Sequence, residues 1–353
     1  MAWRWGRAPR MTAATLAAAA LVTAAMTGCS ALSGSASTGG ANSITLYSGQ
    51  HPQTTQKLVA EFEKRTGIKV SVRSDDEAVL ANQIVTEGSR SPADVFYTEN
   101  TPPLEFLQGK GLLSTLSSST LAATPSKYNS PQGDWVGVSA RVSVLIYNPR
   151  LISKSRLPTS VMQLADPKYQ GKLALAAGET DFQPIVTSVL RAHGMAATQK
   201  WLAAVKANAA GHLYPDNETV TSDVNRGSAA FGIINQYYWY RLRAEIGAGA
   251  THSKIAFFAP RDPGYVLDVS GAAVLQSSSH QAAAQRLVAF LVSQPAQEII
   301  GGHSLSYEYP LASGVTTAAP ETPLRQLQPN PITLGELGTG SAAVALLRRA
   351  GLL

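Results

Sequence analysis

The sequence has 353 residues, of which 44% are hydrophobic and 15% charged, with a formal net charge of +6. That length can fill about two domains. No basic run carries interleaved aromatic residues, so we expect no nucleic-acid partner. No apolar stretch after Cys29 is long enough to cross a membrane, and Cys29 is the only cysteine, which excludes an intrachain disulfide.

The amino terminus has the pattern of a secretory signal. Three arginines within the first ten residues precede an Ala-rich apolar segment at 12–25, which is too short to span a membrane. The Gly28-Cys29 junction resembles a bacterial lipobox, in which the cysteine is lipidated; the alternative is a plain signal peptide with a coincidental cysteine. We therefore expect a lipoprotein signal peptide at 1–28 and a flexible Ser/Gly tether at 29–42.

The first folded segments alternate between strand and helix. Short apolar or alternating runs predict strands at 44–47, 68–72 and 93–97. Helices are expected between them, the first ending at Gly67, and a third helix begins near Pro102. This β-α-β-α-β order predicts an α/β fold with a parallel, doubly wound sheet.

The middle of the chain contains a longer apolar strand, 142–147, which we expect to cross from one lobe to another. A second strand is expected at 173–176, and its loop, 177–181, leads into a helix. A loop is expected around Asn217, and the strand 270–275 is expected to return the chain to the first lobe. The remaining elements are expected as helices around 185–190, 201–205, 287–291 and 342–349 and a strand at 255–258.

An aromatic stretch follows a buried strand expected at 229–234. The pattern then turns helical and stops at Gly247, so Asn235 is the expected N-cap and Tyr237 and Tyr238 lie in the first turn. A helix N-terminus after a strand favours a negative oxygen. Because a bound cation can remove the proton of a phenol near neutral pH, this pair is typical either of a site for a hard cation or of an aromatic cluster that fills a core.

Four polar positions share one property: each follows the carboxyl end of an expected strand. They are His51, Glu99, the loop 178–181 and the Tyr237/Tyr238 pair. In a doubly wound fold such ends face one cleft. An imidazole, a carboxylate and two phenolates make a nitrogen and oxygen set suited to a trivalent cation. The set is unlike the Cys/His spacing of a zinc site and unlike an Asp-rich calcium loop.

Enzyme signatures are weak or absent in this sequence. It has no phosphate-binding loop of the Walker type and no HExxH zinc motif. Residues 247–252 follow a helix and lack the last glycine of a dinucleotide fingerprint, and 302–306 lack the final glycine of a nucleophile elbow. Arg141 and Arg261 can balance negative charge in a cleft, with a surface position as the alternative.

Six segments together resemble one protein family. They are 46–51, 87–99, 234–239, 261–264, 270–275 and 308–311. On these segments the chain resembles, collinearly from about residue 43 onward, the periplasmic ferric-ion-binding proteins of bacterial iron ABC importers. The resemblance implies a type II periplasmic-binding-protein fold. Two lobes, each a doubly wound and mostly parallel sheet with flanking helices, would enclose a ligand cleft.

The expected domain boundaries combine this resemblance with the pattern of elements. Lobe 1 would begin with 43–141 and be completed by a return segment. Lobe 2 would lie between these two parts of the chain. The expected ranges are 43–141 and 266–316 for lobe 1, 142–265 for lobe 2, and 317–353 for C-terminal helices that pack on lobe 2.

The resemblance also implies a ligand set for Fe(III). The family's histidine, glutamate and twin tyrosines fall on His51, Glu99, Tyr237 and Tyr238. In many relatives a small anion, often phosphate, completes the coordination. The residues that match the polar groups around this anion are Asn100, Asn217 and Asn235.

One loop departs from the family pattern. Where relatives present a small Ser-Gly-Ala loop to the anion, this chain has Glu179, Thr180 and Asp181. Two carboxylates repel phosphate. The hypotheses are that one carboxylate, or water, replaces phosphate at the iron, that the carboxylates point into solvent and leave the anion in place, or that the cleft accepts an organic iron chelate.

The function implied is a non-enzymatic, extracytoplasmic binding protein. It would be a monomer, anchored to the cell membrane through Cys29, that captures Fe(III) and delivers it to an ABC permease. The alternatives are the same fold binding an iron chelate, a polyamine or an organic anion, an extracytoplasmic hydrolase, or a structural or adhesive lipoprotein.

Overall fold

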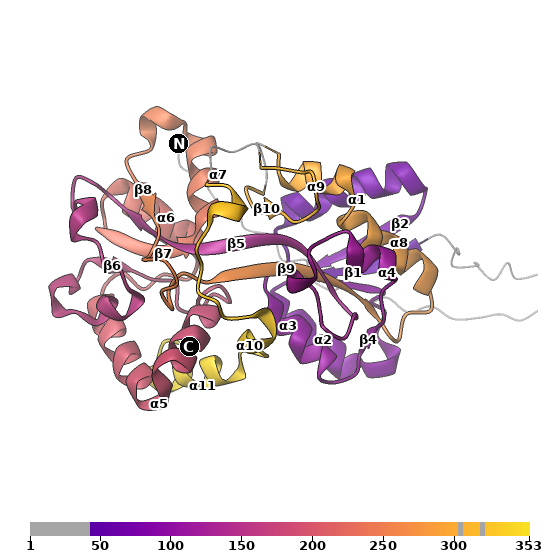
Figure 1. The fold of residues 1–353 in the computed structure, drawn as a ribbon, viewed down its shortest axis with the longest axis horizontal. Helices are drawn as coiled ribbons and strands as arrows, with labels where there is room; N and C mark the ends of the chain where they lie inside the picture. The colour runs from indigo at the N-terminus through magenta and orange to yellow at the C-terminus, as the bar shows by residue number, and fades with distance from the viewer. Residues whose placement is uncertain (1–42, 303–305, 318–321) are drawn as a thin grey trace, which may run out of the picture. The chain divides into compact units, whose positions relative to one another are not determined.

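The computed structural model describes residues 43–302, 306–317 and 322–353. The expected signal peptide, the expected lipidation site Cys29 and the expected tether lie outside these residues. Within the described ranges, no helix has both the length and the apolar character needed to cross a membrane. Figure 1 shows the helices arranged around a sheet through which two long strands run.

The first half of the sheet has the strand order β2-β1-β3-β9-β5. The strands β1 (Ser43–Ser48), β2 (Lys69–Ser74) and β3 (Val95–Thr98) pair in parallel, as the alternation of strands and helices predicts. The helix α1 (Pro52–Thr66) connects β1 to β2 and ends at Gly67, whose φ of 70° is the left-handed conformation that favours glycine at a helix end. The helix α2 (Glu77–Glu87) leads on to β3.

Two long strands connect the halves of the molecule. The strand β5 (Val136–Tyr147) is buried along its whole length and begins six residues before the strand expected at 142. The strand β9 (Leu267–Leu275) pairs antiparallel with both β5 and β3, because it brings the chain back from the second half. Two short strands, β4 (Leu113–Ser114) and β10 (Tyr309–Pro310), pair with β9 and β5.

The second half of the sheet is built on the carboxyl-terminal part of β5. The strands β7 (Phe231–Asn235) and β8 (Lys254–Ala256) run antiparallel to β5, and β6 (Leu173–Ala174) runs parallel to β7. The helix α5 (Phe182–Asn208) is broken at Gly194, whose backbone is non-helical. This break explains why the sequence predicts two helices in this range.

A further helix, α6 (Asn217–Arg226), occupies a range where the sequence predicts a loop. Its N-cap is Asp216, whose side chain accepts a hydrogen bond from the backbone of Thr219. The only apolar side chains that it buries are Val220 and Val224, which is too few for a clear helical pattern. The helix α7 (Gln236–Ile246) follows β7 directly.

The remaining helices cover the flanks of the sheet. The C-terminal helix α11 (Ser341–Ala350) packs on α5, and α10 (Leu334–Leu337) contacts both α3 (Thr101–Gln108) and α5. On the first half of the sheet, α8 (Gln281–Leu291) and α9 (Gln294–Ile300) pack against α1. In the described part of the chain, the other short helices are α4 (Ser118–Ala122) and the 3₁₀ turns at Gly88–Arg90, Ser126–Tyr128, Lys154–Arg156, Val161–Ala165, Pro167–Tyr169, Ala248–Ala250 and Leu324–Gln326.

Candidate metal site

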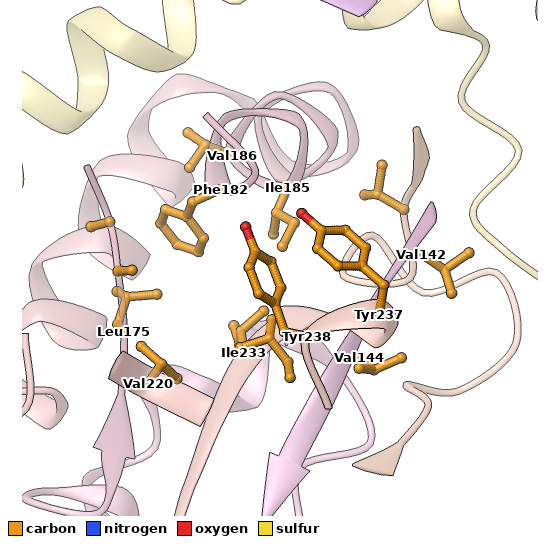
Figure 2. Packing of buried hydrophobic residues seen from close by; sticks show 14 of the residues in the cluster. Val142, Val144, Leu175, Phe182, Ile185, Val186, Val220, Ile233, Tyr237 and Tyr238 are labelled. Carbon is orange, nitrogen blue, oxygen red and sulfur yellow. The ribbon is translucent and has the colours of Figure 1, made fainter. Parts of the chain in front are cut away.

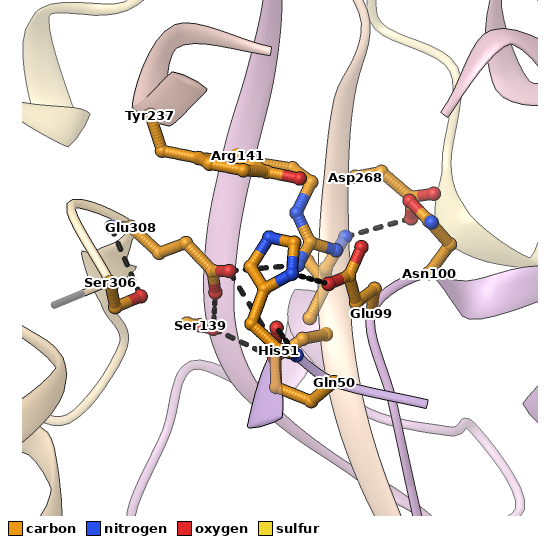
Figure 3. Close-up of polar contacts among 12 residues, drawn as sticks. Gln50, His51, Glu99, Asn100, Ser139, Arg141, Tyr237, Asp268, Ser306 and Glu308 are labelled. Atoms are coloured by element: carbon orange, nitrogen blue, oxygen red, sulfur yellow. Dashed lines mark hydrogen bonds and ion pairs between the residues drawn. The ribbon is translucent and has the colours of Figure 1, made fainter. Parts of the chain in front are cut away.

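The first side of the candidate site is built at the ends of two paired parallel strands. His51 occupies the N-cap position of α1, just after β1, and Glu99 follows β3. The Nδ1 atom of His51 lies 2.9 Å from Oε1 of Glu99, and Figure 3 shows the two side chains facing each other. The Nε2 atom of His51 is buried and has no hydrogen-bond partner among the described residues. A second interaction is therefore open to this nitrogen.

The second side is built where β7 becomes α7. Asn235 occupies the N-cap position, as expected, but its side chain makes no capping hydrogen bond. Tyr237 and Tyr238 lie in the first turn of α7 with ring centroids 4.2 Å apart, and Figure 2 shows their hydroxyls pointing in the same direction. Both rings belong to the main hydrophobic cluster, so the rings pack in the core and a shared polar end remains.

His51 brings the two sides together. Its ring centroid lies 5.4 Å from that of Tyr237 and 6.1 Å from that of Tyr238, both in edge-on arrangements. The structure therefore gathers His51, Glu99, Tyr237 and Tyr238 in one place. No group of three or more His, Cys, Asp or Glu side chains with metal-binding spacing occurs among the residues that the structure describes. Two of the four residues gathered here are tyrosines, which do not belong to those residue types.

Asp181 lies where the resemblance implies an anion. Its Oδ1 accepts a hydrogen bond from Nδ2 of Asn100 at 3.3 Å, and its Oδ2 accepts one from Nδ2 of Asn217 at 3.2 Å. The hydroxyl of Tyr237 donates to Oδ2 at 3.4 Å, and Thr180 also accepts from Asn100, at 3.2 Å. Two of the three asparagines that match the family's anion contacts, Asn100 and Asn217, therefore donate to a carboxyl group of this chain.

The acidic groups on the two sides respond differently to burial. Burial alone would raise the pKa of Glu99, but the hydrogen-bonded imidazole of His51, followed by the guanidinium groups of Arg141 and Arg241, outweighs burial and holds that pKa below its ordinary range. Burial raises the pKa of both Tyr237 and Tyr238 well above the ordinary value, and the nearby Asp181 and Glu99 carboxylates raise it further.

The pKa values of the two carboxyl groups in the loop 179–181, which departs from the family pattern, are also raised. Burial, followed by repulsion from Asp181, Glu218 and Glu99, raises the pKa of Glu179 from 4.5 to about 9. Burial and repulsion from Glu99 raise the pKa of Asp181, although the guanidinium of Arg141 and the amide of Asn100 act against this. At neutral pH Glu179 is therefore protonated in this structure, and it brings no full negative charge to the site.

Arg141 supplies positive charge from the strand β5. It is fully buried, its Nη2 lies 3.0 Å from Oε1 of Glu308, and its Cζ lies 5.7 Å from the ring centroid of Tyr237. Its Nε and Nη1 atoms have no hydrogen-bond partner in the part of the chain that the structure describes. Gln50 and Ser139 also donate to Glu308, a residue to which the sequence analysis assigns no role.

Two further candidate residues, Arg261 and Asn235, are not in direct contact with the group of His51, Glu99, Tyr237 and Tyr238 in any contact described above. Arg261 is exposed, and its backbone bonds with Gln328 and Asn330, so the structure does not bring it to the others. Asn235 lies next to Asp181 and Asn217, with which it lines a small cavity of about 10 Å³. A larger cavity of about 710 Å³ lies beside His51 and Tyr238.

A solute-binding protein is the class that this fold and cleft define. The family model described as "Bacterial extracellular solute-binding protein" matches residues 48–298. The chain is 36% identical over 310 residues to the Fe(3+)-binding periplasmic protein of Serratia marcescens, covering 88% of this chain and 90% of that protein. It is 35% identical over 318 residues to the major ferric iron-binding protein of Neisseria meningitidis, covering 90% and 95%.

Solved structures agree. Iron-bound HitA from Pseudomonas aeruginosa matches with a TM-score of 0.83 at 39% identity, covering 88% of this chain and 99% of that one. Trichodesmium IdiA (FutA), in complex with iron and citrate, matches with a TM-score of 0.75 at 28% identity and covers 88% and 99%. The chain belongs to the periplasmic ferric-iron-binding proteins of the extracellular solute-binding family. The fold class expected from the resemblance is thereby confirmed.

Proposed function

We propose that this chain binds Fe(III) through His51, Glu99, Tyr237 and Tyr238. The observation that carries the proposal is the convergence of two neighbouring phenols and one imidazole, with centroid distances of 4.2 to 6.1 Å, at the ends of strands from both halves of the sheet. Fe(III) is a small hard cation, and anionic oxygen donors suit it. The iron-binding names of the relatives support the same cargo.

In this proposal the Asp181 carboxylate occupies the position of the small anion that completes iron coordination in many relatives. Asn100 and Asn217 would hold a free anion, yet both donate to Asp181. Since this carboxylate also accepts from the hydroxyl of Tyr237, it lies beside a proposed iron ligand. Phosphate at this position would meet a carboxylate, which repels it. Iron affinity should therefore depend weakly on added phosphate.

The two halves of the molecule would together capture the ion and deliver it. The inferred lobes are 43–141 with 266–316, and 142–265 with 317–353, and they are joined through β5 and β9. Their opening and closing would release or enclose the ion, and an ABC permease would receive it. The solute-binding family of the chain supports this partner and a non-enzymatic role outside the cytoplasm. We propose that the protein acts as a monomer.

The membrane anchor rests on the sequence alone. The Gly28-Cys29 junction predicts cleavage and lipidation at Cys29, with residues 30–42 as the tether. Cys29→Ala should abolish lipidation and release or mislocalise the protein. Mass spectrometry of membrane-derived protein checks this, and an unmodified Cys29 in that material would contradict the anchor.

An iron chelate is the second candidate cargo. The cavity of about 710 Å³ beside His51 and Tyr238 has space for one, and the IdiA (FutA) structure holds iron together with citrate. A competition titration separates the candidates: the protein receives Fe(III) from a weak chelator, with and without phosphate or citrate. Binding of about one Fe(III) without either anion supports the proposed site. A strict requirement for citrate favours the chelate, and no binding under any condition rejects both.

A further inference from the structure

The turn that carries Glu99 is tied to the first residue of α2. Glu77 is buried, with 3% of its surface exposed. Its Oε2 accepts hydrogen bonds from the backbone N–H of Glu99 at 2.8 Å and of Asn100 at 2.9 Å, and from the hydroxyl of Thr98. Its Oε1 accepts a bond from Nδ2 of Asn100 at 2.9 Å. One carboxyl group thus holds three consecutive residues at the end of β3.

The neighbouring loop leaves space for this carboxyl. Gly49 follows β1, and a Cβ atom at that position would lie 2.5 Å from Cβ of Glu77, which is closer than such atoms approach. Any side chain at position 49 would therefore push α2 away from the turn. The absence of a side chain at Gly49, two residues before His51, therefore allows Glu77 to lie this close to the loop.

The hydrogen bonds continue across the cleft through Asn100. The same Nδ2 that donates to Glu77 lies 3.2 Å from Oγ1 of Thr180 and 3.3 Å from Oδ1 of Asp181. The Oδ1 atom of Asn100 is buried without a hydrogen-bond partner among the described residues. Nδ2 of Asn100 therefore donates to two carboxyl groups, Glu77 and Asp181, and both favour the same orientation of the amide.

We propose that Glu77 is a positioning residue of the iron site. It does not contact the metal; it fixes the backbone from which Glu99 projects and the orientation of the Asn100 amide that holds Asp181. The inference rests on the proposed function, since it concerns residues on both sides of that site. Partners of metal ligands commonly act in this way, and their loss typically costs about 10- to 100-fold in metal affinity.

Glu77→Gln tests the proposal with almost no change in volume. The amide would present an N–H group to Nδ2 of Asn100, so either this hydrogen bond is lost or the Asn100 amide turns and places its oxygen against Asp181. We expect Fe(III) affinity to fall by roughly 10- to 100-fold and the visible band of the bound iron to shift as Glu99 loses its position. Titration against a competing chelator measures the affinity, and the visible spectrum of the iron-loaded protein measures the shift of the band.

Glu87→Gln is the matched control because Glu87 is the last residue of the same helix. It also accepts several hydrogen bonds, among them those from Tyr47 at 3.0 Å and Ser91 at 2.6 Å. Both variants should lower the melting temperature of the iron-free protein, but only Glu77→Gln should change iron affinity and the band. Equal effects of the two variants on iron binding would overturn the proposal.

A double-variant cycle identifies the route of the effect. If Glu77 acts through Glu99, the affinity losses of Glu77→Gln and Glu99→Gln should be clearly non-additive, whereas full additivity contradicts the proposal. Should Glu77→Gln fail to fold, Asn100→Ala cuts the same connection from the other side and is judged by the same criteria. Absence of iron binding in the unmodified protein would instead reject the proposed function.

Discussion

The two sides of the candidate site differ in how their acidic groups are prepared for a cation. At the ends of β1 and β3, Glu99 is already ionised because His51 lies 2.9 Å away. At the start of α7, Tyr237 and Tyr238 hold their protons because burial raises their pKa values. A cation that binds here would meet the ionised carboxylate of Glu99 on the first side, whereas the two phenols on the second side would have to release their protons. The two phenols should therefore contribute to the pH dependence of binding.

Loss of either phenol should have the largest effect. Tyr237→Phe and Tyr238→Phe each remove a proposed oxygen donor while the ring still packs in the core, so the fold should survive. Affinity for Fe(III) should fall by more than about 100-fold, beyond the cost of losing a partner of a ligand. Competition titration measures the loss, and circular dichroism checks the fold. Wild-type affinity in both single variants would show that these phenols are not ligands.

Proton release compares the two sides directly. Because Tyr237 and Tyr238 are protonated in the free protein and Glu99 is not, iron binding should release at least two protons near pH 7. Affinity should then rise with pH, by about 100-fold per unit for two protons. Calorimetry in buffers of different ionisation enthalpy counts the protons. Release of less than one proton per iron would contradict phenolate ligation.

Asp181 tests whether the chain supplies its own anion. In Asp181→Ala the amides of Asn100 and Asn217 lose their carboxylate, so phosphate can enter. We expect iron affinity to fall by roughly 10- to 100-fold and to be partly restored by phosphate. The unmodified protein should respond little to phosphate. A large phosphate-dependent gain in the unmodified protein would refute this assignment.

The smallest expected effect concerns Glu179 and stability. Its pKa is raised from 4.5 to about 9 on folding, so its contribution to the stability of the iron-free protein is fully present below pH 4.5 and is lost as the pH rises toward 9. Glu179→Gln removes this dependence. The variant should melt a few degrees higher than the unmodified protein at about pH 8 and equally at about pH 4.5. Thermal scans at both pH values measure this, and an equal shift at both would contradict it.

The positions of the four proposed ligands could be predicted because they depend on local sequence. His51, Glu99 and the tyrosine pair each follow a strand, and the carboxyl ends of strands in such sheets meet at one cleft. Gly67 and Gly247 end the helices they were expected to end. These features need only a short window of sequence.

What the sequence could not indicate depends on contacts between distant segments. Asp181 was expected beside the site, but its bonds to Asn100 and Asn217 span 81 and 36 residues. In the sequence, Glu77 looks like an ordinary first residue of a helix. Its proposed positioning role depends on its buried hydrogen bond with the backbone of Glu99. Arg261 has the residue type expected near an anion, yet it lies exposed in a turn with φ at 64°. Pattern alone does not reveal such distant pairings.

The most direct measurement is the visible spectrum of the purified protein during addition of Fe(III). Phenolate bound to Fe(III) gives a charge-transfer band, which neither an unoccupied aromatic cluster nor a site without phenolate can produce. We expect a band that saturates at about one iron per chain in the unmodified protein and is absent in the Tyr237→Phe/Tyr238→Phe double variant. Iron binding without a band, or the same band in the double variant, would contradict it.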